Sequence, residues 1–200
     1  MEKEFLADRL RVRIYPDRKS MGEAAAADIA AAIRRVLAEK ECCNMIFAAA
    51  PSQNEVLAAL AADKTVDFAR INAFHMDEYC GLAPSAPQGF GNFLRAAIFE
   101  KAPFRSVHYL NGNAADIPAE CARYGALLEA FPTDIVCLGI GENGHIAFND
   151  PPVANFRDPV LCKQVALDPV CREQQVHDGC FAEIESVPET AITLTVPRLC

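Results

Sequence analysis

The fold is decided by the stretch Leu138-Gly-Ile-Gly-Glu-Asn-Gly-His-Ile-Ala-Phe-Asn-Asp-Pro-Pro152. An apolar run, Ile135 to Leu138, leads into this loop, and two prolines end it. The loop presents Asn143, His145 and Asp150. An apolar strand followed by a polar, glycine-rich loop is typical of α/β proteins, which place their chemistry at the carboxyl edge of a sheet. The stretch therefore predicts an α/β fold with a site at that edge.

The rest of the chain alternates apolar runs with helix-like segments. Strands are expected at residues 10–15, 44–50, 70–76, 107–110, 135–140 and 190–196, and helices near 20–40, 52–60, 93–98 and 118–128. Strands that alternate with helices of this length predict a parallel sheet covered by helices. Apart from Asn44 at its start, the run from 44 to 50 is apolar throughout, which is typical of a strand buried on both faces.

Length, charge and cysteine usage exclude several classes of protein. Two hundred residues suit a single domain, so residues 1–200 are expected to form one unit. No apolar run reaches the ~18 residues of a membrane span, and the charged N-terminus is not a signal peptide. Nine cysteines without a C-x-x-C pair indicate reduced thiols in the cytoplasm. A net charge of −8 argues against a nucleic-acid partner but leaves an anionic substrate open.

Two Ser-x-x-Glu patterns predict helix starts, at Ser20 with Glu23 and at Ser52 with Glu55. The second helix begins just beyond the buried strand 44–50, so its free backbone N–H groups would point at the sheet edge. Such a helix start can bind an anion. The alternative is an ordinary capped helix without a ligand.

Two carboxylates, Asp77 and Glu78, end the strand expected at 70–76. Neighbouring side chains at a strand end point to opposite faces, so only one of them should face the site. A carboxylate that acts as a base in a covered site would need some desolvation. The alternative is a helix cap or a surface pair.

His145 is the best candidate for proton transfer, because imidazole exchanges protons near pH 7. A single histidine is more often structural, but this one lies in a glycine-flanked loop between polar residues. His108 and His177 lack such surroundings and are expected to be structural. The spacing Gly139-x-Gly-x-x-Gly144 matches a dinucleotide fingerprint, yet no long helix can follow it before Pro151. No nucleophile motif and no zinc-ligand spacing occurs.

Residues 153–185 show no clear period and hold Arg157, Lys163 and Arg172. A long segment of this kind is often a lid or binding loop. The chain ends at Cys200, where a further helix would begin after the strand at 190–196. We therefore expect a C-terminal part of the fold to be missing.

Two long motifs carry a family resemblance: Phe74-His-Met-Asp-Glu-Tyr-Cys-Gly-Leu82 and Gly139-Ile-Gly-Glu-Asn-Gly-His-Ile-Ala-Phe-Asn-Asp-Pro151. With them, the chain strongly resembles the glucosamine-6-phosphate deaminase (isomerase) family. Further family-like positions follow in order at Leu110–Asn113, Ala119–Cys121 and Val187–Thr193. The resemblance spans roughly residues 20–196. It implies a Rossmann-like three-layer α/β/α sandwich with a mostly parallel sheet.

The resemblance also implies a reaction without metal or cofactor, in which glucosamine 6-phosphate and water give fructose 6-phosphate and ammonia. Asp77 would move a proton between C2 and C1. His145 would open the sugar ring, oriented by Asn143 and Asp150. Many family members have Asp where Asn143 stands, and Glu where Asp150 stands.

Further substrate contacts are expected from Ser52, Gln53, Glu78, Gly141 and Gly144, with Arg172 as the lid arginine. The phosphate loop of many members is rich in Gly and Thr, but here it reads Ala48-Ala-Ala-Pro-Ser-Gln-Asn54. A phosphate-binding lysine of the family would lie beyond Cys200.

Two alternatives stay open. A 6-phosphogluconolactonase-like hydrolase shares the fold and a similar Gly-rich loop, but it lacks the stretches Met76-Asp-Glu-Tyr79 and His145-Ile-Ala-Phe-Asn149. A non-catalytic sugar-phosphate sensor would fit the altered phosphate loop, whereas Asp77 and His145 oppose it. The partner expected in each case is a small sugar phosphate, and the sequence does not decide whether the protein is a homo-oligomer.

Overall fold

The computed structural model describes residues 1–200. Its strands and helices are, in chain order, β1 (Lys3–Ala7), β2 (Leu10–Ile14), α1 (Arg18–Glu39), β3 (Cys43–Phe47), α2 (Asn54–Ala62), β4 (Ile71–His75), β5 (Asp77–Tyr79), α3 (Phe90–Leu94), β6 (Ser106–His108), α4 (Ile117–Ala130), β7 (Ile135–Val136), β8 (Cys162–Ala166), α5 (Pro169–His177), β9 (Thr190–Leu194) and α6 (Val196–Leu199). No helix combines the length and the apolarity that a membrane span requires.

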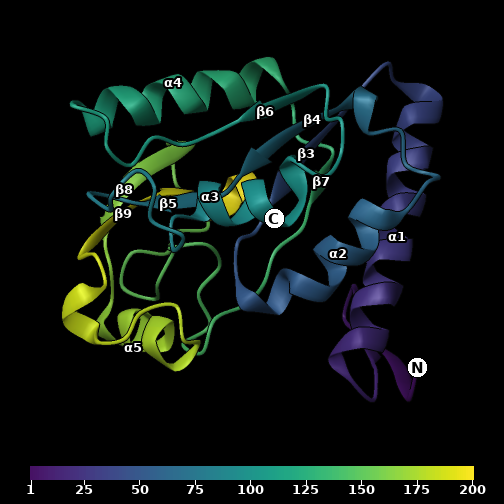
Figure 1. Ribbon diagram of the computed structural model, residues 1–200, viewed down its shortest axis with the longest axis horizontal. Coiled ribbons are helices and arrows are strands. Elements are labelled where there is room, and N and C mark those ends of the chain that lie inside the picture. Colours follow the sequence, from purple (N-terminus) through teal and green to yellow (C-terminus); the bar gives the residue numbers. More distant parts are fainter.

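A parallel sheet in the order β6-β4-β3-β7 forms the centre of the fold. Cys43, Met45 and Phe47 of β3 face one core, which they share with α1, α2 and α3. Ile46 faces the other core, which includes residues of α4. Figure 1 shows α1 and α2 together on one side of the sheet and α4 on the other. This alternation explains why β3 is buried at all five positions, as its apolar sequence predicts.

A second, antiparallel sheet in the order β5-β9-β8 lies beside the central one. Asp77 of β5 pairs in register with Thr193 of β9. Asp77 and Glu78 therefore do not end the parallel strand itself, because the chain leaves β4 at His75 and starts β5 after one residue. The strand expected at 190–196 is confirmed as β9, and it belongs to this second sheet.

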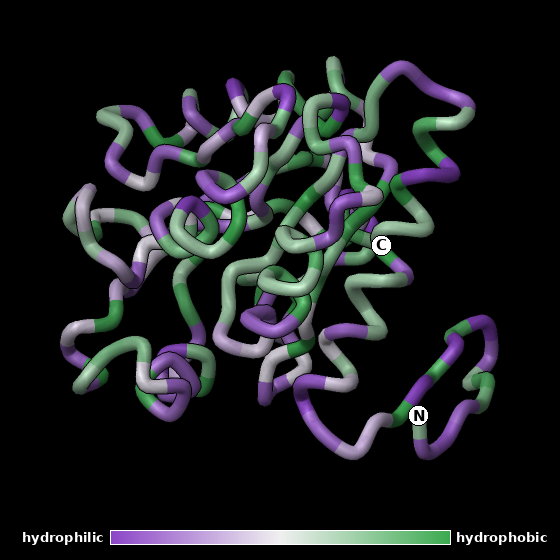
Figure 2. Tube along the Cα trace, turned by 45° about the vertical axis from the view of Figure 1, so that its right-hand side comes forward, coloured by the Kyte–Doolittle hydropathy of each residue, from purple (hydrophilic) through white to green (hydrophobic).

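The first strand expected from the sequence lies outside both sheets. β2 pairs only with β1, as an antiparallel hairpin. Figure 2 shows this hairpin projecting from the body of the molecule near the N-terminus. Phe5, Leu6 and Leu10 are exposed on it. Alternating apolar and charged residues predicted a strand correctly, but not its place in the fold.

Both predicted helix caps are wrong in detail. α1 begins at Arg18, and the Asp17 carboxylate caps it by accepting the Ser20 N–H at 2.7 Å. Ser52 lies in a short 3₁₀ turn, Pro51–Gln53, without a side-chain cap. As a cap, the Asp17 carboxylate is favoured over an uncharged serine hydroxyl because its negative charge also interacts favourably with the positive end of the helix dipole.

Residues 153–185 are not irregular, which corrects the interpretation of this segment as structureless. They contain β8 and α5. Asp168 caps α5 by accepting the Val170 N–H at 2.9 Å, and Pro169 occupies the first helical turn. An Asp-Pro pair is itself a helix-start signal, so the sequence did contain this information. A lid function for the segment stays a prediction.

Candidate active site

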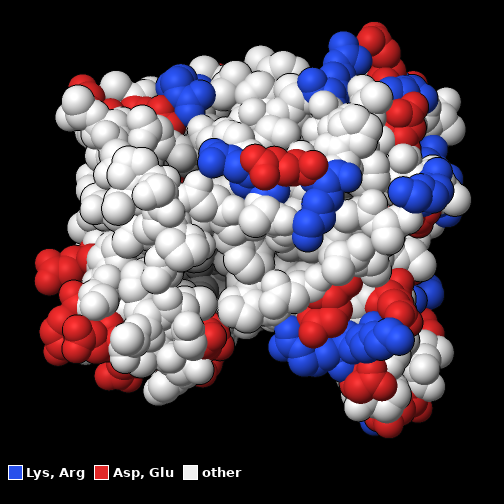
Figure 3. All heavy atoms as spheres, viewed as in Figure 1, with Lys and Arg blue, Asp and Glu red and all other residues white.

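A cavity of about 220 Å³ opens where β3 and β7 end. Its walls come from residues 48–52 after β3, residues 139–141 after β7, and the C-terminal end of α5. The space-filling view in Figure 3 shows a hollow beside α5. Asp77 and His145 both line this cavity, as do Ser52 and Gly141. The structure thus brings these four predicted site residues together at the carboxyl edge of the parallel sheet.

The Asp77 carboxylate is buried at the cavity without a hydrogen-bond donor from the protein. The residue is 6% exposed. Burial, together with the neighbouring Glu78 charge, raises the pKa of Asp77 well above its usual 3.8. A desolvated, uncompensated carboxylate in a cavity is typical of a functional base.

His75 holds the backbone of Asp77 in place, a role that the sequence did not suggest. His75 is fully buried. Its Nε2 accepts the Leu110 N–H at 3.0 Å, so Nδ1 carries the proton and donates to the Asp77 carbonyl at 2.8 Å. Burial lowers the pKa of His75 to about 4, which keeps the ring neutral. His75 therefore fixes the position of Asp77 without placing a charge beside it.

Glu78 points away from the cavity, which corrects its prediction as a substrate contact. Its carboxylate accepts the N–H groups of Tyr79 at 2.9 Å, Phe90 at 3.0 Å and Gly91 at 2.8 Å. The last two are the first backbone N–H groups of α3, so Glu78 anchors that helix start. The expectation that only one carboxylate of the pair faces the site is confirmed.

His145 is held by a network that includes Asn143 and Asp150. The Asn143 side-chain oxygen lies 2.7 Å from His145 Nδ1, and the Asn143 amide donates to Asp150 Oδ1 at 3.0 Å. Asp150 Oδ1 lies 3.3 Å from the same imidazole nitrogen, so the shorter Asp side chain does reach His145. With Nδ1 directed at these two oxygens, Nε2 is the nitrogen left for a substrate. Burial lowers the pKa of His145, although the Asp150 and Asp168 charges oppose the shift.

Gly141 lies directly against the His145 ring. A Cβ at position 141 would lie 2.1 Å from Cε1 of that ring and 2.4 Å from each of its nitrogens. Gly144 does not line the cavity, and its φ of +86° shows that it serves the turn instead. Gly141 thus contacts the catalytic candidate rather than only the ligand, and the prediction of Gly144 as a substrate contact is corrected.

The altered phosphate loop brings Ser52 to the cavity together with Arg18, which sequence reasoning missed. Gln53 does not line the cavity, which corrects its prediction as a substrate contact; its side-chain amide donates to the Ser52 hydroxyl at 3.3 Å. Arg18 is the only Lys or Arg that lines the cavity. Its guanidinium donates to Glu55 at 2.9 and 2.8 Å and to the Pro51 carbonyl at 2.7 Å. No sequence pattern links Arg18 to this loop, because the contact joins α1 to a distant turn.

Arg172 does not line the cavity, which corrects its prediction as the lid arginine. It donates instead to the carbonyls of Ile184 at 2.8 Å and Val187 at 2.9 Å. The α5 side chains that do reach the cavity include Gln174 and Gln175. Gln174 and Gln175 belong to α5, a helix that was not expected from the sequence.

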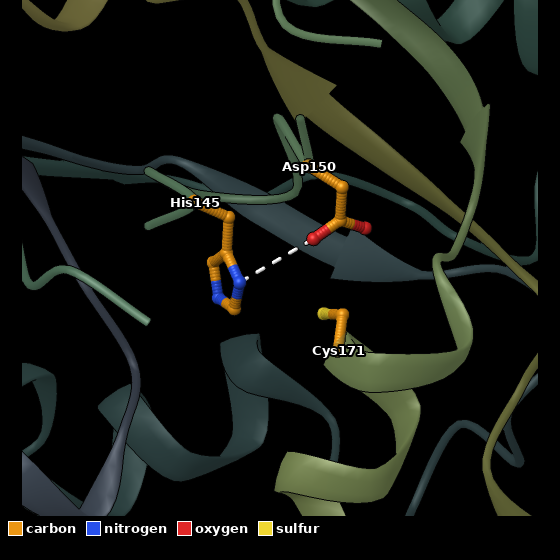
Figure 4. A group of neighbouring side chains, drawn as sticks. All are labelled: His145, Asp150 and Cys171. Carbon is orange, nitrogen blue, oxygen red and sulfur yellow. Dashed lines mark ion pairs between the residues drawn. The ribbon is translucent and has the colours of Figure 1, made fainter. Parts of the chain in front are cut away.

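One group of three side chains has the composition of a metal site. Ligand atoms of His145, Asp150 and Cys171 all lie within 4.8 Å of one another. Figure 4 shows His145 and Asp150 on the loop after β7 and Cys171 on α5, directed toward one another. No metal-ligand spacing is visible in the sequence because Cys171 lies on α5, 21 residues after Asp150.

Comparison with known proteins gives a consistent family assignment. Residues 16–160 match the model of the glucosamine-6-phosphate isomerases/6-phosphogluconolactonase family. A glucosamine-6-phosphate deaminase from Listeria monocytogenes is 35% identical over 156 residues, which cover 78% of this chain and 64% of the relative. One from Lactobacillus delbrueckii subsp. bulgaricus is 33% identical over 136 residues, which cover 67% and 55%. The chain therefore spans about half to two thirds of the length of these relatives.

Solved structures agree on the fold. The structure of a monomeric glucosamine-6-phosphate deaminase superimposes with a TM-score of 0.81 at 28% identity, covering 92% of this chain and 75% of that one. A 6-phosphogluconolactonase from Thermotoga maritima has a TM-score of 0.70 at 19% identity, covering 92% and 76%, which shows the fold alone. The predicted α/β class with a mostly parallel sheet is confirmed. Because the family model covers most of its length, the chain belongs to the glucosamine-6-phosphate isomerase/6-phosphogluconolactonase family.

Proposed function

We propose that the chain carries the site of a glucosamine-6-phosphate deaminase, which converts glucosamine 6-phosphate and water to fructose 6-phosphate and ammonia. One observation carries the proposal: an uncompensated carboxylate, Asp77, and an oriented imidazole, His145, line the same cavity. Isomerisation needs a base over two adjacent carbons, and ring opening needs a group that exchanges a proton with the ring oxygen. The two side chains match these two tasks.

His145 opens the sugar ring. Its Nδ1 proton is held by Asn143 Oδ1, so Nε2 takes a proton from the anomeric hydroxyl and returns it to the ring oxygen. The lowered pKa keeps the imidazole neutral near pH 7, the form that can accept this proton. Asn143 and Asp150 are positioning residues that fix the tautomer.

Asp77 performs the isomerisation. It takes the proton from C2 and returns it to C1, while a proton from the amino group passes to O1, which converts the 2-amino aldose into a 2-imine. Water then adds to the imine, and ammonia leaves. The raised pKa of Asp77 brings its proton affinity closer to that needed near neutral pH. Each step moves a proton or adds water, so the proposal calls for no metal or cofactor.

Arg18 and Ser52 bind the phosphate group of the substrate in this proposal. Arg18 uses Nε and Nη2 to hold Glu55 and the Pro51 carbonyl, and its Nη1 group has no protein partner. The guanidinium is therefore held in position with two N–H groups free, and both Arg18 and Ser52 line the cavity. Arginine with free, fixed donors is well suited to phosphate oxygens.

The test is the production of ammonia and fructose 6-phosphate from glucosamine 6-phosphate by the purified protein. The second candidate is a 6-phosphogluconolactonase, because the family model covers both activities. It would release acid from 6-phosphogluconolactone and no ammonia from the amino sugar. A non-catalytic sensor would bind glucosamine 6-phosphate, measured by calorimetry, without turnover. Absence of ammonia release with binding retained contradicts the deaminase proposal.

A further inference from the structure

The group formed by His145, Asp150 and Cys171 lies behind the cavity rather than in it. Only His145 of the three lines the cavity, whereas Asp150 is 1% exposed and Cys171 is fully buried. Cys171 Sγ lies within 4.8 Å of a carboxylate oxygen of Asp150. Figure 4 shows the imidazole, the carboxylate and the thiol directed at a shared space between the loop and α5. Nothing in the proposed reaction uses the thiol.

The donor set and its spacing suit a tetrahedral transition-metal ion. Zinc binds imidazole nitrogen, carboxylate oxygen and thiolate sulfur, at ~2.0–2.1, ~2.0–2.2 and ~2.3 Å. In a tetrahedron these lengths place the nitrogen and the oxygen roughly 3.3–3.5 Å apart. His145 Nδ1 and Asp150 Oδ1 are 3.3 Å apart. All three donor atoms lie within 4.8 Å, so a small rotation of the Cys171 side chain completes the triangle.

The surroundings hold two of the donors in place. Asp150 Oδ2 accepts the Asp168 N–H at 3.0 Å, which leaves Oδ1 directed at His145. Asn143 Oδ1, 2.7 Å from His145 Nδ1, offers a further oxygen for the fourth position. Partners of this kind, behind the ligands, commonly strengthen metal binding. A carboxylate and a thiolate together also neutralise a divalent cation, which matters in a buried site.

We propose that His145, Asp150 and Cys171 form a binding site for a thiophilic divalent cation of the Zn²⁺ type, and that occupancy inhibits the reaction. The inhibition, though not the binding, rests on the proposed deaminase function. Binding releases the Cys171 thiol proton to solvent, and the His145 proton moves from Nδ1 to Nε2. An imidazole with a metal on Nδ1 and a proton on Nε2 can no longer accept a proton from the sugar.

Cobalt(II) is the first probe, because a thiolate ligand gives it a charge-transfer band that nitrogen and oxygen ligands do not. We expect this band in the wild-type protein, its loss in Cys171→Ser, and its retention in Cys180→Ser. Cys180 is a matched control, since it lines the adjacent cavity but does not belong to the group of three. The serine hydroxyl also keeps a donor for Asp150. A band that survives unchanged in Cys171→Ser overturns the proposal.

X-ray absorption at the zinc edge tests the site without any variant. One equivalent of Zn²⁺ should show one sulfur at ~2.3 Å with nitrogen and oxygen neighbours. Two sulfurs would place the ion at another pair of cysteines and overturn the proposal. Zinc should also inhibit ammonia release, roughly tenfold or more less potently in Cys171→Ser than in Cys180→Ser. Metal binding as expected in a protein that releases no ammonia supports the site and contradicts the proposed function instead.

Discussion

The contact between Gly141 and the His145 ring gives the sharpest prediction, the effect of Gly141→Ala. The added Cβ would lie 2.1 to 2.4 Å from three ring atoms. Non-bonded carbon atoms prefer a separation of about 3.5–4.0 Å, so the ring must move by roughly 1–1.5 Å. That movement breaks the 2.7 Å contact with Asn143 that fixes the tautomer. A misplacement of this size can cost about 10²-fold in rate, and we expect kcat for ammonia release to fall by about that factor.

Gly139→Ala is the matched control in the same loop. A Cβ there would lie 3.6 Å from Gln53 Nε2 and 3.8 Å from Ser52 Oγ, which is ordinary contact. Neither glycine has the positive φ that would strain an alanine, so the two variants differ mainly in the contact with the ring. Thermal melts check that both variants fold. A Gly141→Ala protein with kcat close to that of Gly139→Ala would refute the role given to His145.

Three further predictions concern the carboxylate pair and the phosphate contact. Asp77→Asn should lower kcat by about 10²–10⁴. The variant should also have a higher melting temperature than the wild type at neutral pH. In the wild type, the raised folded-state pKa of Asp77 means that ionising this carboxylate lowers the free energy of unfolding as pH rises, and asparagine removes this cost. Below about pH 4 Asp77 is protonated in both states, so the difference in melting temperature should vanish. Glu78→Gln removes a charge that raises the pKa of Asp77, so the acid limb of the pH profile of kcat/KM should move to lower pH. If the acid limb does not move, its assignment to the ionisation of Asp77 is wrong. Arg18→Gln should raise KM for glucosamine 6-phosphate roughly 10- to 150-fold, whereas the exposed neighbour Lys19→Gln should leave KM unchanged.

The parallel sheet was predictable because burial on both faces demands an apolar strand. β3 and β4 are buried at every position, and their polar residues, Asn44, Asn72 and His75, do not recur at every second position. The hairpin was harder to place. β2 shows the alternation of an edge strand, but a strand pattern says nothing about which partner it finds, and β1 supplies that partner. Local patterns therefore identified the elements better than their pairing.

The candidate site residues also fall into two groups, those whose contacts are local in sequence and those whose contacts join distant elements. The loop with Asn143, His145 and Asp150 was predictable because its contacts join residues close in sequence. The role of Arg18 was not, because its contacts with Pro51 and Glu55 join α1 to a turn that follows β3. The positive charge of a residue alone was also a poor guide to substrate contacts. Arg172 looked like a ligand contact in the sequence, yet backbone carbonyls of the same segment use its guanidinium.

β9 connects the two halves of the proposed site. Thr193 pairs in register with Asp77, and its hydroxyl accepts the Phe148 N–H at 3.1 Å. Asn149, beside Asp150, donates to the Leu194 carbonyl at 2.7 Å. The strand thus holds the base and the imidazole loop on one rigid element. The fit between the two proton-transfer groups depends on this late strand as much as on the motifs that contain them.

The adjacent carboxylates Asp77 and Glu78 show how the fold assigns different tasks to similar side chains. Burial raises the pKa of both. Three backbone N–H groups satisfy Glu78, whereas no protein donor satisfies Asp77. The charge on Glu78 is therefore stabilised by hydrogen bonds, and it raises the proton affinity of its neighbour at the cavity. The strand alternation turns Glu78 toward α3, where it anchors a helix, and turns Asp77 toward the cavity, where we propose that it acts as the base.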